Sequence, residues 1–289
     1  MSFNPKAKQL RQLLNNDDIH VAPGVYDGMT ARLTEQAGFN VIYASGGAIS
    51  RSCGFPDIGL LSFSEVLQRL EQMAEVTKVP IIADADTGFG NAINVSRVVK
   101  AFERIGMAGL HLEDQTFPKR CGHLDDKTLI SSSEMIHKIR IAKESVIDPN
   151  FVIIARTDAI AAENFEKAIE RSKAYLKAGA DVIFVEAPET VEQIEQIAKQ
   201  IPEPKLINMF HGGKTPLVPI DDLKAMGYKL IIIPSDLQRA SIKACQDTLE
   251  EIRKTGDSSA IKDEMTSFSE REQIIRTNDY LAIDDSYKE

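Results

Sequence analysis

The sequence predicts a (β/α)8 barrel, in which eight parallel strands form a closed cylinder inside a ring of helices. Short β-branched runs recur eight times along the 289 residues, amphipathic stretches separate them, and no Pro-, Gly- or Ser-rich linker divides the chain. Strands that alternate with helices form a parallel sheet, and eight such units favour a closed barrel over an open, doubly wound sheet.

Each predicted strand is short, apolar and rich in β-branched residues. The predicted strands are 21–23, 41–44, 80–84, 109–112, 151–155, 182–185, 205–209 and 230–233. Apolar residues at three- and four-residue spacing predict amphipathic helices between them. The most regular of these are 63–76, 92–105, 165–178 and 191–201.

The barrel is predicted to form one catalytic domain over residues 1–257, followed by a helical arm over 258–289. The sequence of the arm is charged and only weakly apolar, so it is not expected to bury much surface against its own barrel. We therefore expect the arm to pack on a neighbouring subunit.

Composition excludes several classes of partner. The net charge of -9 is spread without a basic stripe, which argues against nucleic acid and favours a small soluble substrate. No stretch approaches the roughly 20 apolar residues that span a bilayer, so no membrane partner is expected. The 3 cysteines leave an odd thiol, and no N-terminal run resembles a signal peptide. These features predict a cytoplasmic protein.

Carboxylates follow two neighbouring predicted strands. Asp84 and Asp86 stand two residues apart at one strand end, which predicts that they share a face, and Glu113 follows the next strand. A hard cation is the simplest compensation for three converging acids, and Mg²⁺ fits, with Mn²⁺ as a substitute. The competing interpretation is that Asp84 and Asp86 cap the following helix; Glu113 argues against it.

A cysteine among basic residues follows the fourth strand. Lys119, Arg120 and His123 flank Cys121, and neighbouring cations lower the pKa of a thiol from about 8.5. Such a thiol is suited to proton transfer near neutral pH. The alternative is a buried, apolar cysteine. That is the role expected for Cys245, which lies on an apolar helix face.

Two further strand ends carry groups that bind anions. Ser45, Gly46 and Gly47 expose backbone N–H groups that can hold a carboxylate, although an ordinary βα turn explains them equally well. Arg156 can clamp a carboxylate through its planar guanidinium or form a salt bridge with Glu186, and both interpretations stay open.

Other conspicuous residues have structural interpretations. Gly88 and Gly90 lack the spacing of a dinucleotide-binding fingerprint, so we interpret them as a tight turn. His20, His111 and His137 are expected to be structural.

Five motifs occur in a fixed order: A-D-A-D-T-G-F-G, G-L-H-L-E-D-Q, P-K-R-C-G-H, A-R-T-D and V-E-A-P. Together they resemble the isocitrate lyase and phosphoenolpyruvate mutase superfamily, from about residue 21 to residue 240. K-R-C-G-H resembles the loop of the carbon–carbon lyase branch, above all 2-methylisocitrate lyases, with 2,3-dimethylmalate lyases close by. The phosphonomutase branch tends to carry an asparagine in this loop.

The resemblance implies a Mg²⁺-dependent lyase. Its substrate would be a small dicarboxylate or tricarboxylate, cleaved to pyruvate or a similar 2-oxo acid and a second carboxylic acid. It also implies that Asp84 binds Mg²⁺ directly, while Asp86, Glu113 and Asp57 hold its waters. A homotetramer with swapped C-terminal helices is a further implication, and it matches the unburied arm.

The resemblance also implies catalytic roles. Cys121 would be the general acid, with Lys119 and His123 beside it on a loop that closes over the substrate, and Tyr43 is a possible proton acceptor. Arg156 belongs to the catalytic group as well as to the binding group. The residues expected to bind substrate are Ser45, Gly46, Gly47, Arg156, Glu186 and Asn208.

The sequence departs from this pattern at two places. His211 stands where many relatives place glutamate, and Leu124, Asp125 and Asp126 replace the R-P-N common in methylisocitrate lyases. These departures leave the substrate open. The alternatives are a phosphonomutase such as carboxyvinyl-carboxyphosphonate phosphorylmutase, an oxaloacetate decarboxylase or hydrolase, and a non-catalytic metabolite-binding barrel.

Overall fold

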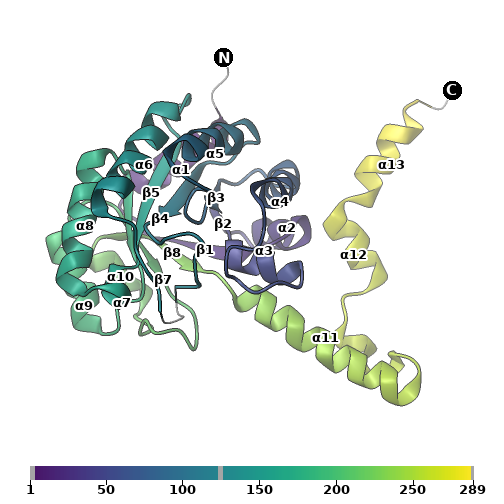
Figure 1. Cartoon of the computed structure of the whole chain (residues 1–289). Coiled ribbons are helices and arrows are strands. Elements are labelled where there is room, and N and C mark those ends of the chain that lie inside the picture. The colour runs from purple at the N-terminus through teal and green to yellow at the C-terminus, as the bar shows by residue number, and fades with distance from the viewer. Residues whose placement is uncertain (1–3, 123–125, 288–289) are drawn as a thin grey trace.

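A computed structural model describes residues 4–122 and 126–287 of the chain. Its eight strands are all parallel and close into a barrel in sequence order, with β8 pairing back to β1 (Figure 1). The strands are β1 (His20–Val25), β2 (Ile42–Ala44), β3 (Ile81–Asp84), β4 (Gly109–Glu113), β5 (Val152–Thr157), β6 (Val182–Val185), β7 (Lys205–Asn208) and β8 (Tyr228–Ile233). The predicted fold class is confirmed, and each predicted strand overlaps an observed one.

Helices surround the barrel and continue beyond it (Figure 1). They are α1 (Pro5–Asn15), α2 (Gly28–Gln36), α3 (Gly46–Ser52), α4 (Phe63–Val76), α5 (Ala92–Arg104), α6 (Ser132–Ser145), α7 (Ala159–Ala162), α8 (Phe165–Ala178), α9 (Val191–Gln200), α10 (Ile220–Ala225), α11 (Asp236–Thr255), the 3-10 helix η1 (Ser259–Glu264), α12 (Phe268–Ile275) and α13 (Thr277–Asp285). The four most regular predicted helices are confirmed as α4, α5, α8 and α9.

The core has two layers because side chains alternate along each strand. On β4, Leu110 and Leu112 pack outward against the helices, whereas His111 stacks inside the barrel against Tyr43. Leu10 of α1 joins the inner apolar cluster. Helix α1 contacts β5 and β8, so we infer that it covers the N-terminal end of the barrel and leaves the C-terminal end for the site.

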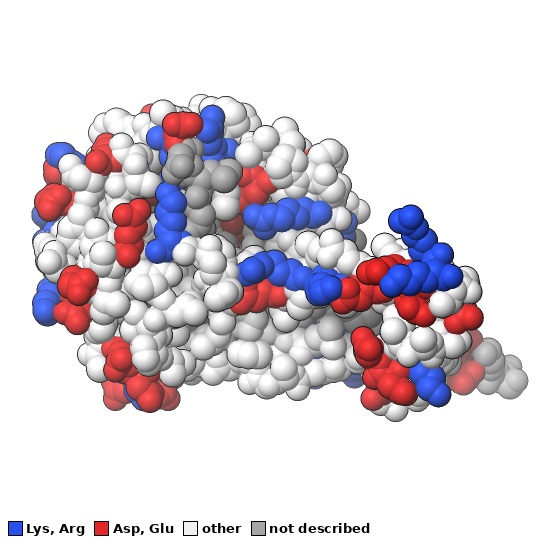
Figure 2. Space-filling model, turned by 90° about the horizontal axis from the view of Figure 1, so that it is seen from below, with Lys and Arg blue, Asp and Glu red and all other residues white. Residues whose placement is uncertain are grey.

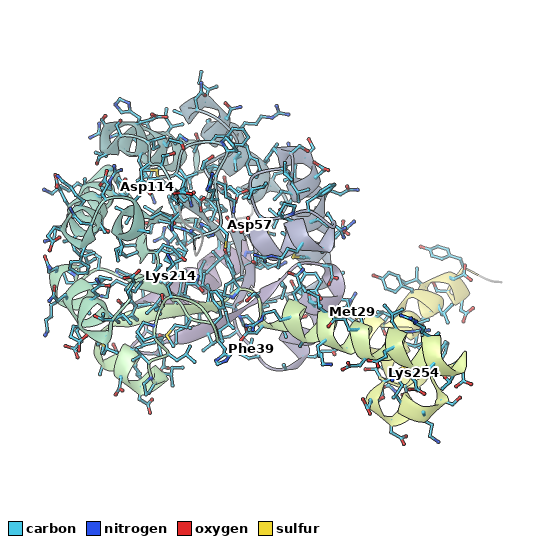
Figure 3. The ribbon with its side chains drawn as sticks, turned by 60° about the horizontal axis from the view of Figure 1, so that its bottom comes forward. Met29, Phe39, Asp57, Asp114, Lys214 and Lys254 are labelled. Carbon is cyan, nitrogen blue, oxygen red and sulfur yellow. The ribbon has the colours of Figure 1, made fainter. Side chains whose placement is uncertain are left out.

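The chain leaves the barrel along α11, ahead of residue 258, where the arm was predicted to begin (Figure 1). Gln238 is the buried residue of this helix, and Lys254 lies near its far end, away from the barrel (Figure 3). Cys245 is therefore exposed, and the prediction that it belongs to the core is wrong. Helix α12 then returns to contact α2.

Acidic and basic side chains are interspersed over the face seen from below (Figure 2). Within the described residues, no helix combines the length and the apolar character needed to cross a membrane.

Candidate active site

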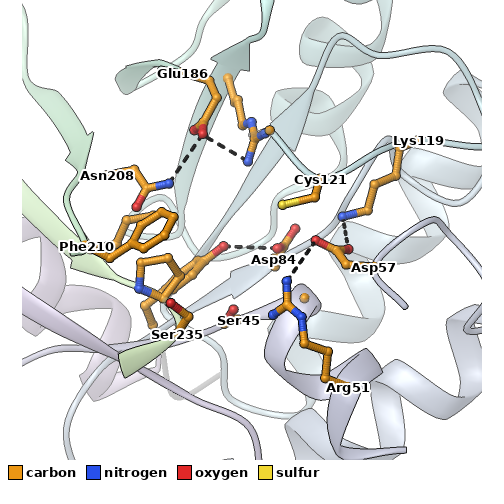
Figure 4. A pocket seen from close by; sticks show the side chains of 16 residues that line it. Ser45, Arg51, Asp57, Asp84, Lys119, Cys121, Glu186, Asn208, Phe210 and Ser235 are labelled. Carbon is orange, nitrogen blue, oxygen red and sulfur yellow. Dashed lines mark hydrogen bonds and ion pairs between the residues drawn. The ribbon is translucent and has the colours of Figure 1, made fainter. Parts of the chain in front are cut away.

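A cavity opens at the carboxyl ends of the strands, between the barrel rim and the chain that follows β4 (Figure 4). Most of the predicted site residues line it: Tyr43, Ser45, Gly47, Asp57, Asp84, Lys119, Cys121, Arg156, Glu186 and Asn208. Gly46, Asp86 and Glu113 adjoin the cavity through contacts with these residues. His123 and its predicted role lie outside the described residues.

Asp84 is the most firmly held carboxylate of the site. Its Oδ1 accepts the backbone N–H of Asp86 at 3.0 Å and lies 3.2 Å from His111 Nε2. Its Oδ2 accepts the Tyr43 hydroxyl at 3.0 Å and the Gly46 N–H at 3.1 Å. Burial alone would raise the pKa of Asp84, but His111, Lys119 and the backbone N–H of Asp86 hold it well below its usual range. The carboxylate is thus ionised and fixed in orientation.

Asp86 reaches the site by a turn, not by strand alternation. Strand β3 ends at Asp84, and Asp86 follows with a φ of 46°. The prediction that the two carboxylates share a strand face is wrong, although Asp86 still lies 2.9 Å from Lys119 Nζ. The alternative role as helix caps also fails, because Asn91 caps α5. Gly88, with a φ of 89°, forms the predicted tight turn.

Lys119 lies among the acids of the site. Its ammonium pairs with Asp57 and Asp86, and its side chain is only 5% exposed. Burial lowers the pKa of Lys119, but Asp86, Asp57, Glu113 and Asp84 outweigh burial and raise it well above its usual value. Several carboxylates therefore face this one ammonium group.

The donor chemistry of this cluster fits a hard divalent ion. Glu113 is buried, and its Oε1 has no hydrogen-bond partner among the described residues. Burial raises its pKa well above the usual range. Among those residues, no three His, Cys, Asp or Glu side chains converge as ready-made direct ligands. Mg²⁺ commonly takes one or two direct carboxylates and keeps several waters, so Asp84 would bind it directly, with Asp57, Asp86 and Glu113 acting through water.

The Cys121 loop, residues 116–122 and 126–128 of the described chain, follows a short antiparallel bridge between Gln115 and Leu129 beyond β4. Thr116 N–H donates to the Thr128 carbonyl at 2.8 Å, and the Gln115 side chain donates to and accepts from the backbone of Arg120, both at 2.9 Å. Cys121 is half-buried, and its sulfur points into the cavity (Figure 4). These hydrogen bonds thus fix the position of the Cys121 backbone relative to the end of β4.

The basic residues near Cys121 are arranged differently from the prediction. The ammonium of Lys119 faces the acids, and the Arg120 guanidinium is half-exposed and lies 3.6 Å from Asp126. Sequence proximity indicated three cations around the sulfur, but two of these side chains point to carboxylates.

Two glycines let the start of α3 approach the acids. A Cβ at Gly46 would lie 2.7 Å from Asp84 Oδ2, and one at Gly47 would lie 2.7 Å from Asp57 Oδ2. Ser45 caps α3, as the ordinary-turn interpretation expects, and the Gly46 N–H is used by Asp84. That Ser45, Gly46 and Gly47 hold a substrate carboxylate stays a prediction.

Arg156 is fixed from several sides. Its Nε and Nη2 donate to the Asp158 carboxylate at 2.9 and 3.1 Å. Glu113 and Glu186 lie 3.5 and 3.7 Å from the guanidinium, which also lies over the Phe184 ring at 5.1 Å. The predicted pairing with Glu186 is confirmed. The guanidinium is buried yet lines the cavity, so it is placed to meet an anionic substrate.

His111 was expected to be structural, but it touches the site. It is fully buried, and its Nε2 lies 2.8 Å from the Tyr43 hydroxyl. Burial, and next Asp84, raise the pKa of Tyr43 well above 10.0, so Tyr43 is a phenol that donates to Asp84. The available signal was the spacing from Glu113, because residues two apart on a strand face the same side.

Asp114 is a second functional residue that sequence reasoning missed. It is fully buried, and it accepts the Thr157 hydroxyl at 2.7 Å, the Asp158 N–H at 3.0 Å and the Tyr175 hydroxyl at 2.7 Å. It therefore ties the end of β4 to the end of β5, directly behind Arg156. Its position next to Glu113 was the only sequence signal.

Comparisons with known proteins agree with this geometry. The profile of the phosphoenolpyruvate phosphomutase family matches residues 10–253. A 2-methylisocitrate lyase from Aeropyrum pernix is 44% identical over 271 residues, 94% of this chain and 87% of that protein. A 2,3-dimethylmalate lyase from Eubacterium barkeri is 39% identical over 97% of this chain and 98% of that protein.

The fold is also similar to that of solved relatives. A structure of oxaloacetate acetylhydrolase bound to the inhibitor 3,3-difluorooxalacetate superposes with a TM-score of 0.93 and 34% identity. The match covers 99% of this chain and 98% of that chain. The chain belongs to the phosphoenolpyruvate mutase/isocitrate lyase superfamily.

Proposed function

We propose that this protein is a Mg²⁺-dependent carbon–carbon lyase for 2-methylisocitrate or a 2,3-dimethylmalate-like hydroxy acid. Its products would be pyruvate or a similar 2-oxo acid and a second carboxylic acid. The observation that carries the proposal is the meeting of Cys121, Asp84 and Arg156 around one cavity. The lyase class is supported further by the names of the two relatives above, at 44% and 39% identity.

The proposed reaction balances without an oxidant or a reductant. The substrate hydroxyl passes its proton to solvent, the bond between the hydroxyl-bearing carbon and its neighbour breaks, and a 2-oxo acid forms; the Cys121 thiolate left after proton delivery takes a proton back from solvent. The electron pair of that bond stays on the carbon next to the second carboxylate, and Cys121 delivers a proton there. Arg156 would hold a carboxylate of the substrate and keep the breaking bond oriented toward the sulfur.

Mg²⁺, when bound, supplies positive charge that polarises the oxygens of a 2-oxo acid. The residues of this chain would hold the ion and its waters, with Asp84 as the direct ligand. Tyr43 and His111 keep Asp84 in place, because both contact its carboxylate. Lys119 balances part of the remaining negative charge.

A panel of substrates tests the proposal. Purified protein with Mg²⁺ is given 2-methylisocitrate, 2,3-dimethylmalate, oxaloacetate or phosphonopyruvate. Pyruvate released from the two hydroxy acids is followed in a coupled assay, and loss of oxaloacetate is followed by its own absorbance. We expect turnover of at least one of the first two compounds and its loss on chelation with EDTA. Conversion of phosphonopyruvate alone to phosphoenolpyruvate, followed by ³¹P NMR, would establish the phosphonomutase alternative. Cleavage of oxaloacetate alone would establish the hydrolase or decarboxylase.

We also propose that the protein is a homotetramer that uses its C-terminal arm. Apolar residues of the arm such as Phe268, Leu281 and Ile283 are 72%, 54% and 60% exposed, and a contiguous apolar surface left open to water marks an interaction site. A partner subunit that covers them would remove this area from water.

Deleting residues 258–289 tests the role of the arm. We expect the oligomeric mass from light scattering to fall and the melting temperature to decrease, because the subunit interface loses its arm. The full-length chain at the same concentration is the control. An unchanged mass in the truncated protein would rule out the arm as the element that joins subunits.

A further inference from the structure

Lys127 is a buried cation for which the proposed reaction has no role so far. It lies near the C-terminal end of the Cys121 loop, and its side chain is 1% exposed. The ammonium donates to the backbone carbonyl of Gly122 and, at 2.9 Å, to Asp158 Oδ1. A buried ammonium is costly unless it is paired, so this geometry is strongly specified.

Asp158 is shared between the Cys121 loop and the substrate-facing arginine. Its carboxylate accepts from Lys127 Nζ and from Nε and Nη2 of Arg156. Asp114 fixes the backbone of Asp158 from behind, at 3.0 Å. One immobile carboxylate therefore sets the position of both Arg156 and the loop.

Gly122 is pressed against the same group of residues. A Cβ at this position would lie 2.5 Å from Arg156 Nη2 and 2.5 Å from Glu186 Oε1. Only a glycine lets the loop come this close. The backbone of Gly122 is thus bound by Lys127 on one side and packs against the Arg156–Glu186 pair on the other.

We propose that Lys127 is a positioning residue that sets the distance between the Cys121 thiol and a substrate held by Arg156. It acts through the carbonyl of Gly122 and the carboxylate of Asp158, and it does not touch the substrate. The Asp158 carboxylate thereby fixes both the loop that carries the thiol and the Arg156 guanidinium. The distance between the proton donor and the bound carboxylate of the substrate is therefore kept constant. The inference rests on the proposed lyase function for its kinetic consequence, but not for its structural one.

Cysteine labelling tests the structural consequence without any substrate. The intact protein and the Lys127→Met variant are treated with iodoacetamide, and the labelling rates of Cys121, Cys53 and Cys245 are read by peptide mass spectrometry. Cys53 is half-buried like Cys121, and Cys245 is exposed, so both serve as internal standards. We expect the ratio of Cys121 to Cys53 labelling to rise by about 10- to 100-fold, because a charged hydrogen bond no longer holds the loop.

Lys205→Met is the matched control. Lys205 is 2% exposed and also donates to backbone carbonyls, of Ile201 and Glu203, but it lies at the start of β7, at the opposite end of the barrel. This variant should lose stability without changing the labelling ratio. A rise in the labelling of Cys53 and Cys121 together in Lys127→Met would indicate general loosening and would overturn the proposal.

A second variant approaches the same contact from the other side. Gly122→Ala keeps Lys127 but places a methyl group against Arg156 and Glu186, so it should raise the labelling ratio in the same direction. It also keeps the proposal testable if Lys127→Met does not fold. An unchanged ratio in a folded variant of either kind contradicts the proposal.

The kinetic arm uses whichever substrate the panel identifies. Lys127→Met should lower kcat by about 10- to 100-fold while the affinity for Mg²⁺ is retained, because Asp84 and its partners are untouched. A raised labelling ratio with unchanged kcat would show that the loop position does not govern the reaction. Absence of lyase activity would refute the proposed function. The labelling experiment would still test the role of Lys127 in that case, because it needs no substrate.

Discussion

Replacing Cys121 by serine should lower kcat by about 10²- to 10⁴-fold, the range that general acid catalysis contributes. The sulfur points into the cavity that Asp84 and Arg156 line, and a serine hydroxyl of similar size is a far weaker acid (Figure 4). The substitution changes neither the acids proposed to hold Mg²⁺ nor the contacts of Gly122. Turnover should therefore fall while KM and Mg²⁺ affinity stay near their original values. Steady-state kinetics and calorimetric titration with Mg²⁺ measure these quantities.

Cys53→Ser is the matched control for this substitution. Cys53 is half-buried like Cys121, but it ends α3 and contacts Arg69 at 3.8 Å instead of lining the cavity. It should leave kcat unchanged. Near-normal turnover of Cys121→Ser on the best substrate would remove the thiol from the reaction and would leave its proton to another donor.

The barrel and its rim were predictable because they follow from local patterns. Apolar runs define the strands, and in a parallel barrel every strand ends at the same rim, so Asp84, Glu113 and Arg156 had to meet. Predicting that these three residues meet required only the order of the strands and the rule that parallel strands end at one rim. Cys121 was singled out by its basic neighbours and Asn208 by the family resemblance, and both line the same cavity.

Other features depend on turns and on contacts between distant segments. The positive φ of Asp86 turns its carboxylate toward Lys119, and no strand periodicity encodes this. Lys127 pairs with Asp158, which lies 31 positions away in the chain and also holds Arg156, so only the folded structure brings these residues together. Cys245 was assigned to the core because α11 is amphipathic, but an amphipathic pattern does not say whether the apolar face meets the same chain.

The largest effect is expected for Asp84→Asn, which should abolish measurable Mg²⁺ binding and lower turnover by about 10³-fold or more. A metal ion supplies several kcal/mol of charge stabilisation in such reactions, and each 1.36 kcal/mol corresponds to about tenfold in rate. The amide removes the charge of the one carboxylate that the site holds ready as a direct ligand. Titration with Mn²⁺, followed by electron paramagnetic resonance, reports binding independently of turnover.

The same substitution also has a structural cost, which must be separated from the loss of metal. Both oxygens of Asp84 accept a backbone N–H, from Asp86 and from Gly46, so an amide NH₂ must face one of these donors in either orientation. We expect a loss of about 1–3 kcal/mol in the free energy of unfolding for that unsatisfied donor.

Asp148→Asn reproduces this structural cost far from the site. Asp148 is 4% exposed, and its two oxygens also accept backbone N–H groups, of Asn4 at 2.8 Å and Asn150 at 2.9 Å. It precedes β5, at the end of the barrel opposite the cavity. This variant should be destabilised to a similar extent yet retain Mn²⁺ binding and turnover. If Asp84→Asn also retained both, the acids at the rim would serve only to balance Lys119, and the proposed metal-dependent lyase would have to be abandoned.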